Sequence, residues 1–326
     1  MNNTPIYVPE YAYQAGSSTP LFSIGSFDFQ VYSLTIMLGY LCSILTILFF
    51  WRREKLNMEK LYVLILITIP MGILGSRFGY MVEQWIYADI PFNGSAWWKI
   101  WEGGLSIQGG LIITILVDLF YCYTQRKYLD IRKAASLIIP TILIGQFIGR
   151  WGNYANHEVY GKIDWTGSSV LIFGKGFAHN MFISDAYTNS LGLHGAYRYP
   201  LFLYEGIANL VGYLLIVWVA NFFGLFKPGT SVGLYLIWYG LIRMGMEPLR
   251  EESYNLYEYV AIGFVLVGAL VFVYYQFWNN IKYTVTKKHK VFKFYNYENE
   301  ESYFIHVDNT SIPHLFKKNL TYTWFK

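Results

Sequence analysis

Charged side chains are scarce in this chain. Asp, Glu, Lys and Arg make up 14% of its 326 residues, whereas they make up about 25% of an average soluble domain. Lys and Arg are absent altogether from the first 51 residues. Apolar residues, 54% of the chain, occur in runs of about 20, which is the length of a bilayer span. This composition excludes an ordinary soluble globular protein and predicts an all-α polytopic membrane protein.

Cysteine and the common catalytic motifs are also scarce. Cys42 and Cys122 both fall within apolar runs, so we expect no disulfide framework, and a CxxC metal motif is absent. His157 and His194 show no metal-ligand spacing with a partner. No P-loop or HExxH pattern occurs. The sequence therefore offers no nucleotide or zinc peptidase site of a familiar kind.

Seven apolar segments have the character of membrane-spanning helices. They are Val31–Trp51, Leu61–Met81, Gly104–Tyr123, Ala134–Arg150, Pro200–Phe223, Val232–Met246 and Tyr257–Phe277. The sixth is short and contains glycine. The first starts late and no basic residue precedes it, so we interpret it as a retained helix and not as a cleavable signal peptide.

The distribution of basic residues predicts the orientation. Lys and Arg cluster after the first, third and seventh spans, at Arg52, Arg53, Lys55, Lys60, Arg126, Lys127, Arg132, Lys133, Lys282, Lys287, Lys288, Lys290 and Lys293. The loop between the second and third spans has only Lys99. Because loops rich in Lys and Arg stay in the cytoplasm, we expect the N-terminus outside and the C-terminus in the cytoplasm.

Two segments outside the spans complete the expected organisation. Residues 151–199 separate spans four and five and suit a small extracytoplasmic head, although a mere connector is the alternative. Residues 281–326 form a cytoplasmic C-terminal tail of mixed charge. We therefore expect one transmembrane domain over residues 1–280, with the head as an insert.

Unusual polar residues of six spans fall toward one leaflet in this topology. They lie at the outer ends of spans one to six, at Tyr32, Arg77, Tyr80, Gln108, Arg150, Tyr204, Glu205, Arg243, Glu247 and Arg250. An arginine at membrane depth costs about 2.5–3.5 kcal/mol by insertion scales. Guanidinium also binds phosphate in a bidentate fork. The pattern therefore indicates a protein that handles a phosphate-bearing lipid or ligand near the outer surface.

Each of these residues also has a structural interpretation. Arg77 and Arg250 can extend into the headgroup region without any further role. Arg243 and Glu247 are four residues apart and can form an ion pair on one helical face. Asn153 and Glu158 can satisfy the turn after span four. Most glycines can serve helix packing, whereas Gly152 and Gly161 are better candidates for turns at the site.

Five sequence blocks resemble the prolipoprotein diacylglyceryl transferase family. The most specific is Gly149-Arg150-Trp151-Gly152-Asn153, followed by Asn156, Glu158 and Tyr160-Gly161. The other blocks are Gly75-Ser76-Arg77-Phe78-Gly79-Tyr80, Trp101-Glu102-Gly103-Gly104-Leu105-Ser106-Ile107-Gln108-Gly109-Gly110-Leu111, Tyr199-Pro200-Leu201-Phe202-Leu203-Tyr204-Glu205 and the stretch from Tyr239 to Arg250. Their order and spacing agree with the family over roughly residues 20–280.

The resemblance implies an activity and its partners. The family transfers the diacylglyceryl group of phosphatidylglycerol to the thiol of a lipobox cysteine in a prolipoprotein signal peptide, in the bacterial cell membrane, without a metal or soluble cofactor. Nucleic acid is not among the expected partners. By similarity, Arg150 binds phosphatidylglycerol and Arg243 is the second essential arginine. Family positions also include Tyr32, Asn153, Glu158, Gly161, Tyr239 and Glu247.

The chain departs from the family at two positions. Gln108 and Tyr199 stand where the family usually has histidine. An amide does not act as a general base at neutral pH. We therefore expect Gln108 to act by hydrogen bonding, and Glu205, Glu102, Glu247 or water to take the thiol proton. A transporter or flippase for an anionic lipid or solute, and a decayed relative that only binds lipid, are the alternatives.

Overall fold

The computed structural model describes residues 5–18, 20–24, 27–87, 97–98, 104–251, 255–279 and 281–314, most of them helical. The chain divides into two compact units. Unit 1 comprises Met1–Phe50 and Ala135–Asn296, and unit 2 comprises Trp51–Ala134 and Tyr297–Lys326. The units are described separately below.

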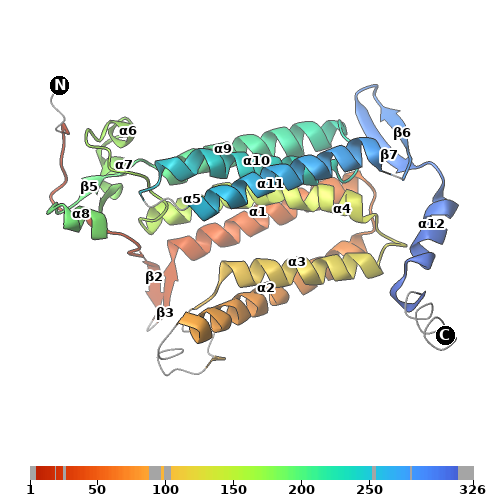
Figure 1. Ribbon diagram of the computed structural model, residues 1–326, viewed down its shortest axis with the longest axis horizontal. Coiled ribbons are helices and arrows are strands. Elements are labelled where there is room, and N and C mark those ends of the chain that lie inside the picture. The colour runs from red at the N-terminus through yellow and green to blue at the C-terminus, as the bar shows by residue number, and fades with distance from the viewer. Residues whose placement is uncertain are drawn as a thin grey trace. The chain divides into compact units, whose positions relative to one another are not determined.

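Unit 1 contains most of the long helices, which lie side by side (Figure 1). They are α1 (Val31–Arg53), α4 (Ile131–Ile138), η3 (Ile139–Thr141), α5 (Ile142–Ala155), α9 (Leu201–Tyr213), η4 (Leu214–Asn221), α10 (Thr230–Met246), η5 (Glu247–Leu249), α11 (Asn255–Val273) and η6 (Tyr274–Trp278). The last residues of α1 and the first of α4 belong to unit 2. Helix α5 packs along α9, and α10 along α11.

Glycines permit the closest helix contacts of unit 1. A Cβ on Gly233 of α10 would lie 2.6 Å from the carbonyl oxygen of Gly268 on α11. A Cβ on Gly39 of α1 would lie 3.1 Å from the carbonyl oxygen of Gly145 on α5. Small residues are what allow apolar helices to approach in this way. The packing interpretation therefore holds for Gly145, whereas a Cβ on Gly149 would meet no described atom within 4 Å.

Residues 151–199 fold into a small mixed head at one end of these helices (Figure 1). Its elements are α6 (Ser168–Leu171), α7 (Lys175–Asn180), β4 (Phe182–Ser184), α8 (Ala186–Ser190) and β5 (Ala196–Tyr197). Strand β4 pairs antiparallel with β5 and parallel with β1 (Tyr13–Gln14) near the N-terminus. The core of the head contains Val170, Ala178, Met181, Phe182, Ile183, Tyr197 and Phe202. The insert is therefore a packed structure and more than a connector.

Unit 2 is built on a helical pair. Helix α2 (Met58–Tyr87) packs along α3 (Ile107–Thr124). A Cβ on Gly79 would lie 2.6 Å from the Cα of Gly109, so neither position has room for a side chain. Deeper in the pair, the Thr68 hydroxyl lies 3.0 Å from both carboxylate oxygens of Asp118. The same hydroxyl lies 2.7 Å from the Leu64 carbonyl oxygen, so it is the polar neighbour of the acidic side chain within the pair.

The C-terminal tail divides between the two units. Strands β6 (Tyr283–Lys288) and β7 (Phe292–Tyr297) form a two-stranded sheet beside unit 1. Helix α12 (Glu300–Asn309) belongs to unit 2, where Tyr303 and Val307 are buried. The Tyr303 hydroxyl donates to the carbonyl of Arg126 over 3.1 Å. The predicted boundary between a transmembrane domain and a tail at residue 280 stays a prediction.

The helices agree with a membrane protein, and the expected count of seven spans stays a prediction. Among the described residues, five helical stretches have the length and hydropathy of a bilayer span: Val31–Arg53, Met58–Ile86, Ile131–Ala155, Leu201–Asn221 and Leu256–Trp278. Helix α10 has 17 residues, and the apolar part of α3 covers Gln108–Thr124. Short strands also occur, including the β2 (Pro20–Ile24) and β3 (Phe27–Gln30) hairpin, so the fold is mainly but not wholly helical.

The fourth apolar segment ends later than its sequence indicated. Helix α5 continues past Arg150 to Ala155, so the Gly149–Asn153 block lies within a helix. The predicted turn at Gly152 is therefore wrong. A Cβ on Gly152 would lie 2.3 Å from the Thr35 hydroxyl and 3.1 Å from the Tyr32 Cα. This glycine is needed because α1 and α5 touch there.

Candidate functional site

Arg150 is the centre of a polar network at the head end of unit 1. One Nη atom donates to Glu205 of α9, and the other donates to Asn153 Oδ1 over 3.0 Å. The Asn153 amide in turn donates to Glu158 Oε2 over 3.0 Å. Glu205 is 1% exposed. Helices α5 and α9 and the segment that follows α5 therefore hold a guanidinium and two carboxylates in one connected group.

A second group of charges spans the last turn of α10 and the residues that follow it. Arg243 Nη2 lies 3.5 Å from Glu247 Oε2, and Arg250 Nε lies 4.0 Å from the same oxygen. Glu247 is 5% exposed. Burial lowers the pKa of Arg250, and the charge of Arg243 lowers it further. The charges of Glu205 and Arg150 also affect the pKa of Arg250, which indicates that the two groups lie near each other.

Several polar atoms of this site have no hydrogen-bond partner among the described residues. Arg150 Nε and Arg250 Nε are buried donors without an acceptor. Glu205 Oε2 is a buried acceptor without a donor. A buried unpaired polar group costs roughly 1–3 kcal/mol. The site is therefore incomplete by itself, and it offers donors suited to an anionic oxygen.

Close contacts at Gly152 and Gly161 bring further segments of the chain to this site. Tyr32 packs against Gly152, and its hydroxyl interacts with the charges of Glu158 and Arg150. Gly161 donates its N–H to the Tyr199 carbonyl over 2.9 Å. A Cβ on Gly161 would lie 2.8 Å from the Leu249 carbonyl oxygen. Gly161 therefore permits the close approach that sets the position of the segment carrying Arg250.

The structure places two further predicted residues at the edge of this network. Tyr239 lies one helical turn before Arg243, and its ring stacks on Tyr235 at 6.1 Å and meets Phe264 edge-on. Tyr204 precedes Glu205 and interacts with Tyr199 and Asp164 of the head segment. Both residues therefore have identifiable packing roles in addition to any role in binding.

Arg77, Tyr80 and Gln108 belong to unit 2 and are described there. Arg77 is 8% exposed, and it donates to the carbonyls of Trp97 and Gly104 over 2.7 and 3.0 Å. Its guanidinium also lies 5.2 Å from the centre of the Tyr80 ring. The interpretation of Arg77 as a side chain extended into headgroups is therefore wrong, because it fixes the segment before α3.

Gln108 lies in the first turn of α3 and is exposed. Its amide oxygen accepts a hydrogen bond from the Ser106 hydroxyl over 3.1 Å, and that hydroxyl is 2.5 Å from Glu83 Oε1. Ser106 also caps the helix by accepting from the Gly109 N–H. Gln108 is thus positioned by hydrogen bonding. Glu102, another carboxylate considered from the sequence, lies outside the described residues.

Arg198 is a buried charge that the sequence analysis missed. Its side chain is 0% exposed, and its two Nη atoms donate to Asp185 and Glu251 over 2.6 and 2.5 Å. The Tyr160 ring lies 5.3 Å from its guanidinium, and the Tyr160 hydroxyl donates to Asp185 over 3.0 Å. Arg198 therefore ties the head to the residue that follows Arg250. Its two carboxylate partners are distant in the sequence, so no local pattern signals the pairing.

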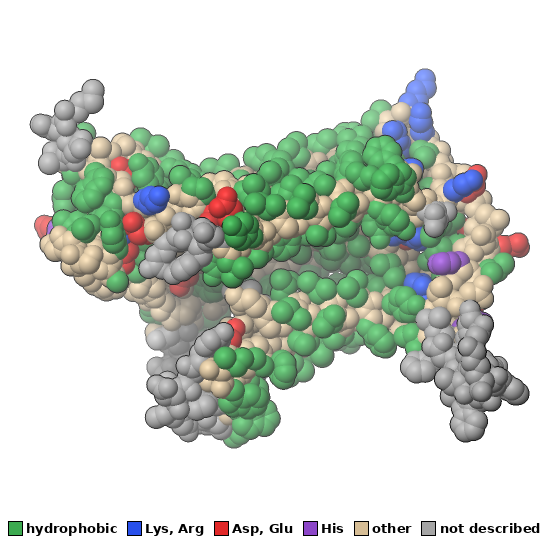
Figure 2. Space-filling view, in the orientation of Figure 1, with side chains coloured by type: hydrophobic (Ala, Val, Ile, Leu, Met, Phe, Trp, Pro, Cys, Tyr) green, Lys and Arg blue, Asp and Glu red, His purple; other side chains and the backbone are tan. Residues whose placement is uncertain are grey.

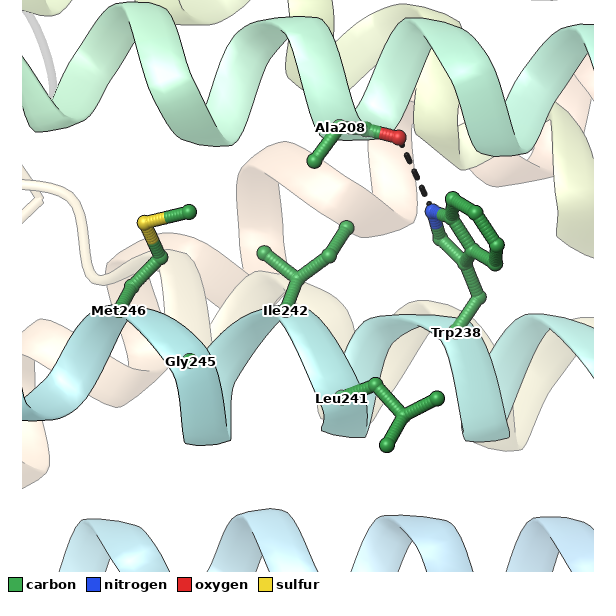
Figure 3. Close-up of a pocket in the computed structure, with 6 residues that line it drawn as sticks. All are labelled: Ala208, Trp238, Leu241, Ile242, Gly245 and Met246. Carbon is green, nitrogen blue, oxygen red and sulfur yellow. Dashed lines mark hydrogen bonds between the residues drawn. The ribbon is translucent and has the colours of Figure 1, made fainter.

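An apolar pocket of about 260 Å³ lies between α9 and α10. Its lining consists of Ala208, Trp238, Leu241, Ile242, Gly245 and Met246, as Figure 3 shows. The Trp238 indole donates to the Ala208 carbonyl over 3.0 Å and joins the two helices (Figure 3). This lining can contact hydrocarbon but has no charged group. Among the described residues, no three His, Cys, Asp or Glu side chains are grouped to hold a metal ion.

Comparison with known proteins identifies similar sequences over most of the chain. The model of the prolipoprotein diacylglyceryl transferase family matches residues 19–275. A phosphatidylglycerol–prolipoprotein diacylglyceryl transferase of Mycoplasmopsis pulmonis is 49% identical over 279 residues, which cover 85% of each chain. Proteins of the same name from Streptococcus uberis and Streptococcus equi subsp. zooepidemicus are 31% and 32% identical, covering 77% and 78% of this chain and 92% and 93% of theirs.

Proposed function

This chain belongs to the prolipoprotein diacylglyceryl transferase family, and we propose that it transfers the diacylglyceryl group of phosphatidylglycerol to a prolipoprotein. The acceptor is the thiol of the lipobox cysteine in the signal peptide. A thioether forms and glycerol phosphate leaves. The relatives compared above are all named as transferases, which favours this activity over a transporter or flippase for an anionic lipid.

The proposed setting is the bacterial cell membrane, crossed seven times. Five helical stretches meet the length of a span, and α3 and α10 are the proposed further two. Basic residues lie beyond the α1 and α11 ends that are remote from the head. Because such residues stay in the cytoplasm, the head and the Arg150 site face the outer leaflet. Phosphatidylglycerol and the signal peptide then both reach the site from the bilayer.

The observation that carries the proposal is the incomplete hydrogen bonding around Arg150. Its Nε and that of Arg250 are buried donors without a protein acceptor among the described residues, and Arg243 lies one turn before Glu247. A phosphodiester supplies the missing acceptors and the negative charge. During transfer, negative charge grows on the leaving phosphate, and guanidinium groups at low dielectric stabilise it. Arg150, Arg243 and Arg250 are the proposed phosphate-binding residues.

The bond changes are those of a nucleophilic substitution at the glyceryl carbon that bears the phosphate. The cysteine thiolate forms the new S–C bond, the C–O bond to phosphate breaks, and glycerol phosphate leaves with the electron pair. A thiol has a pKa of about 8.5 and must first lose its proton. Glu205, with one carboxylate oxygen free of a described hydrogen-bond donor, and Glu247 are candidate acceptors of that proton.

The remaining site residues have proposed supporting roles. Asn153, Glu158, Tyr32 and Tyr204 shape the lipid site around Arg150, while Gly161 and Tyr239 position its second half. Arg77, Tyr80 and Gln108, all of unit 2, are proposed substrate-binding residues. For Gln108 the proposed role is hydrogen bonding to substrate, and a Gln108→Ala variant that keeps full activity would remove it from the mechanism.

The test is a transfer assay on the purified protein in phosphatidylglycerol-containing micelles. A lipobox peptide is added, and mass spectrometry detects the diacylglyceryl adduct on its cysteine. Arg150→Ala runs beside the wild type, and Arg52→Ala, which changes an exposed arginine of unit 2, is the matched control. The expected result is an adduct with wild type and Arg52→Ala that is lost with Arg150→Ala. A folded wild type that forms no adduct with competent lipid would refute the activity.

A further inference from the structure

The β6–β7 hairpin of the tail carries charged side chains of one sign only. Residues 279–297 contain five lysines and no Asp or Glu. Lys282, Lys287, Lys288 and Lys290 are exposed, whereas Lys293 is half-buried. In Figure 2 the Lys and Arg side chains gather at this end of unit 1. No carboxylate within the hairpin neutralises these charges, so the surface is strongly cationic.

Strand β7 fixes the hairpin to the rest of unit 1. The Phe292 ring stacks on Phe223 with 5.6 Å between ring centroids and meets Phe222 edge-on at 5.3 Å. The Tyr295 hydroxyl donates to the Gly224 carbonyl over 3.1 Å. A Cβ on Gly224 would lie 2.1 Å from the Lys293 carbonyl oxygen. The hairpin is therefore a docked element, and its tip has a defined direction.

The tip projects sideways from the helices. The hairpin stands across the direction of α10 and α11 at the end remote from the head (Figure 1). Its turn places His289 and Lys290 in the left-handed region, with φ of 51° and 61°, which makes a tight reversal. Val285 and Val291 are 46% and 53% exposed beside the lysines. An element across membrane-spanning helices lies along the bilayer surface, and lysines with exposed apolar side chains suit a headgroup layer.

We propose that the β6–β7 hairpin binds the anionic headgroups of the bilayer surface on the side remote from the head. Clusters of several lysines immediately beyond a membrane helix attract anionic lipid, by roughly a fivefold gain in binding for each lysine. A nucleic acid would meet the same charges, but the sideways projection at the helix ends favours the lipid surface. The hairpin then anchors the tail and lies apart from the Arg150 site, so the proposal is independent of the transfer reaction.

The test is hydrogen exchange of residues 283–297 in the full-length protein in nanodiscs. One preparation contains phosphatidylcholine alone, and the other adds phosphatidylserine, an anionic lipid that is not the proposed donor. The triple variant K287Q/K288Q/K290Q removes three exposed charges, and K287R/K288R/K290R keeps them. Anionic lipid is expected to slow exchange about five- to tenfold in the wild type and in the arginine variant, and not in the glutamine variant.

Salt and a competing polyanion complete the test. Protection is expected to disappear in about 1 M salt, where the screening length falls to about 3 Å. Exchange that is equal in the two lipid mixtures overturns the proposal. Protection by added duplex DNA in phosphatidylcholine nanodiscs, without protection by phosphatidylserine, also overturns it and reassigns the surface to nucleic acid.

Discussion

Two arginines of unit 1, Arg150 and Arg198, are both paired with carboxylates, but their surroundings differ. The Arg198 side chain is 0% exposed, and each Nη atom meets a different carboxylate, Asp185 or Glu251. The Arg150 side chain is 21% exposed and meets one carboxylate, Glu205, and one amide. Both retain an unpaired Nε among the described residues. Burial of an arginine by itself therefore does not identify a ligand site.

The two arginines differ in the net charge of the group to which each belongs. Arg198 faces two carboxylates, which gives a formal charge of −1 (1 − 2) and would repel an anion. Arg150 lies with Arg243 and Arg250 against three carboxylates, so the formal charge of that group is zero (3 − 3). The access to solvent and the absence of excess negative charge make the Arg150 site suitable for a phosphate. The Arg198 cluster instead has a structural role, because it connects the head to the residue that follows Arg250.

The comparison predicts that loss of Arg198 mainly affects stability. In Arg198→Gln, Asp185 and Glu251 lose their common cation, and breaking a buried ion pair costs about 3–5 kcal/mol. We expect a large fall in the temperature of unfolding and increased hydrogen exchange in the head. Lys162→Gln, an exposed change in the same head, is the control. A variant of unchanged stability with lost lipid binding would make Arg198 a ligand residue and remove the distinction.

Replacing Arg150, by contrast, should reduce transfer activity and leave the stability of the fold nearly unchanged. Arg150→Lys keeps the positive charge but loses the planar fork that Glu205, Asn153 and a phosphate share. Losing one charged hydrogen bond costs about 1.5–3 kcal/mol, so we expect transfer to fall by roughly 10- to 150-fold. Transfer kinetics and thermal unfolding are measured on the same preparation. If Arg150→Lys lowers the unfolding temperature strongly and leaves the transfer rate nearly unchanged, Arg150 has a structural role like that of Arg198.

The sequence indicated the site of the first arginine but not the second, for a physical reason. Arg150 stands at the end of an apolar run, where a charge is costly, so it is conspicuous in the sequence. Arg198 lies in a polar insert, and its carboxylates are 13 and 53 residues away, so no short pattern marks it. Similarly, β1 has two residues and pairs with β4 far along the chain. Long-range partners of this kind are set by tertiary packing.

Gly161 contacts the segment that connects the Arg150 site and the Arg198 cluster. Arg250 of the first and Glu251 of the second are consecutive residues of that segment. In Gly161→Ala the added Cβ would lie 2.8 Å from the Leu249 carbonyl oxygen and 3.1 Å from Leu201 Cγ. Overpacking typically costs about 1–3 kcal/mol. We therefore expect lower stability together with weaker transfer, because the segment carrying Arg250 must shift. Thermal unfolding measures the stability, and the peptide assay measures the transfer.

Gly149→Ala is the matched control for that change. Gly149 lies in α5, and a Cβ there would meet no described atom within 4 Å. Alanine is favoured over glycine in a helix by up to about 1 kcal/mol. We expect equal or higher stability with transfer preserved. A similar loss in both variants would show that the contact with Leu249 is not the cause.

Acid should loosen the Arg198 cluster through Asp185. Burial opposes ionisation of this carboxyl, but the Thr188 N–H and the Arg198 guanidinium outweigh it and lower its pKa. A lowered folded-state pKa adds stability above the unfolded value of about 3.9, and this stability is lost as pH falls through the folded value. We expect the head to lose protection from hydrogen exchange progressively below about pH 4, as the pH falls from the unfolded-state pKa toward the lower folded-state pKa of Asp185. Asp185→Asn should make that loss shallower, and an unchanged pH profile in this variant would assign the acid sensitivity to other carboxylates.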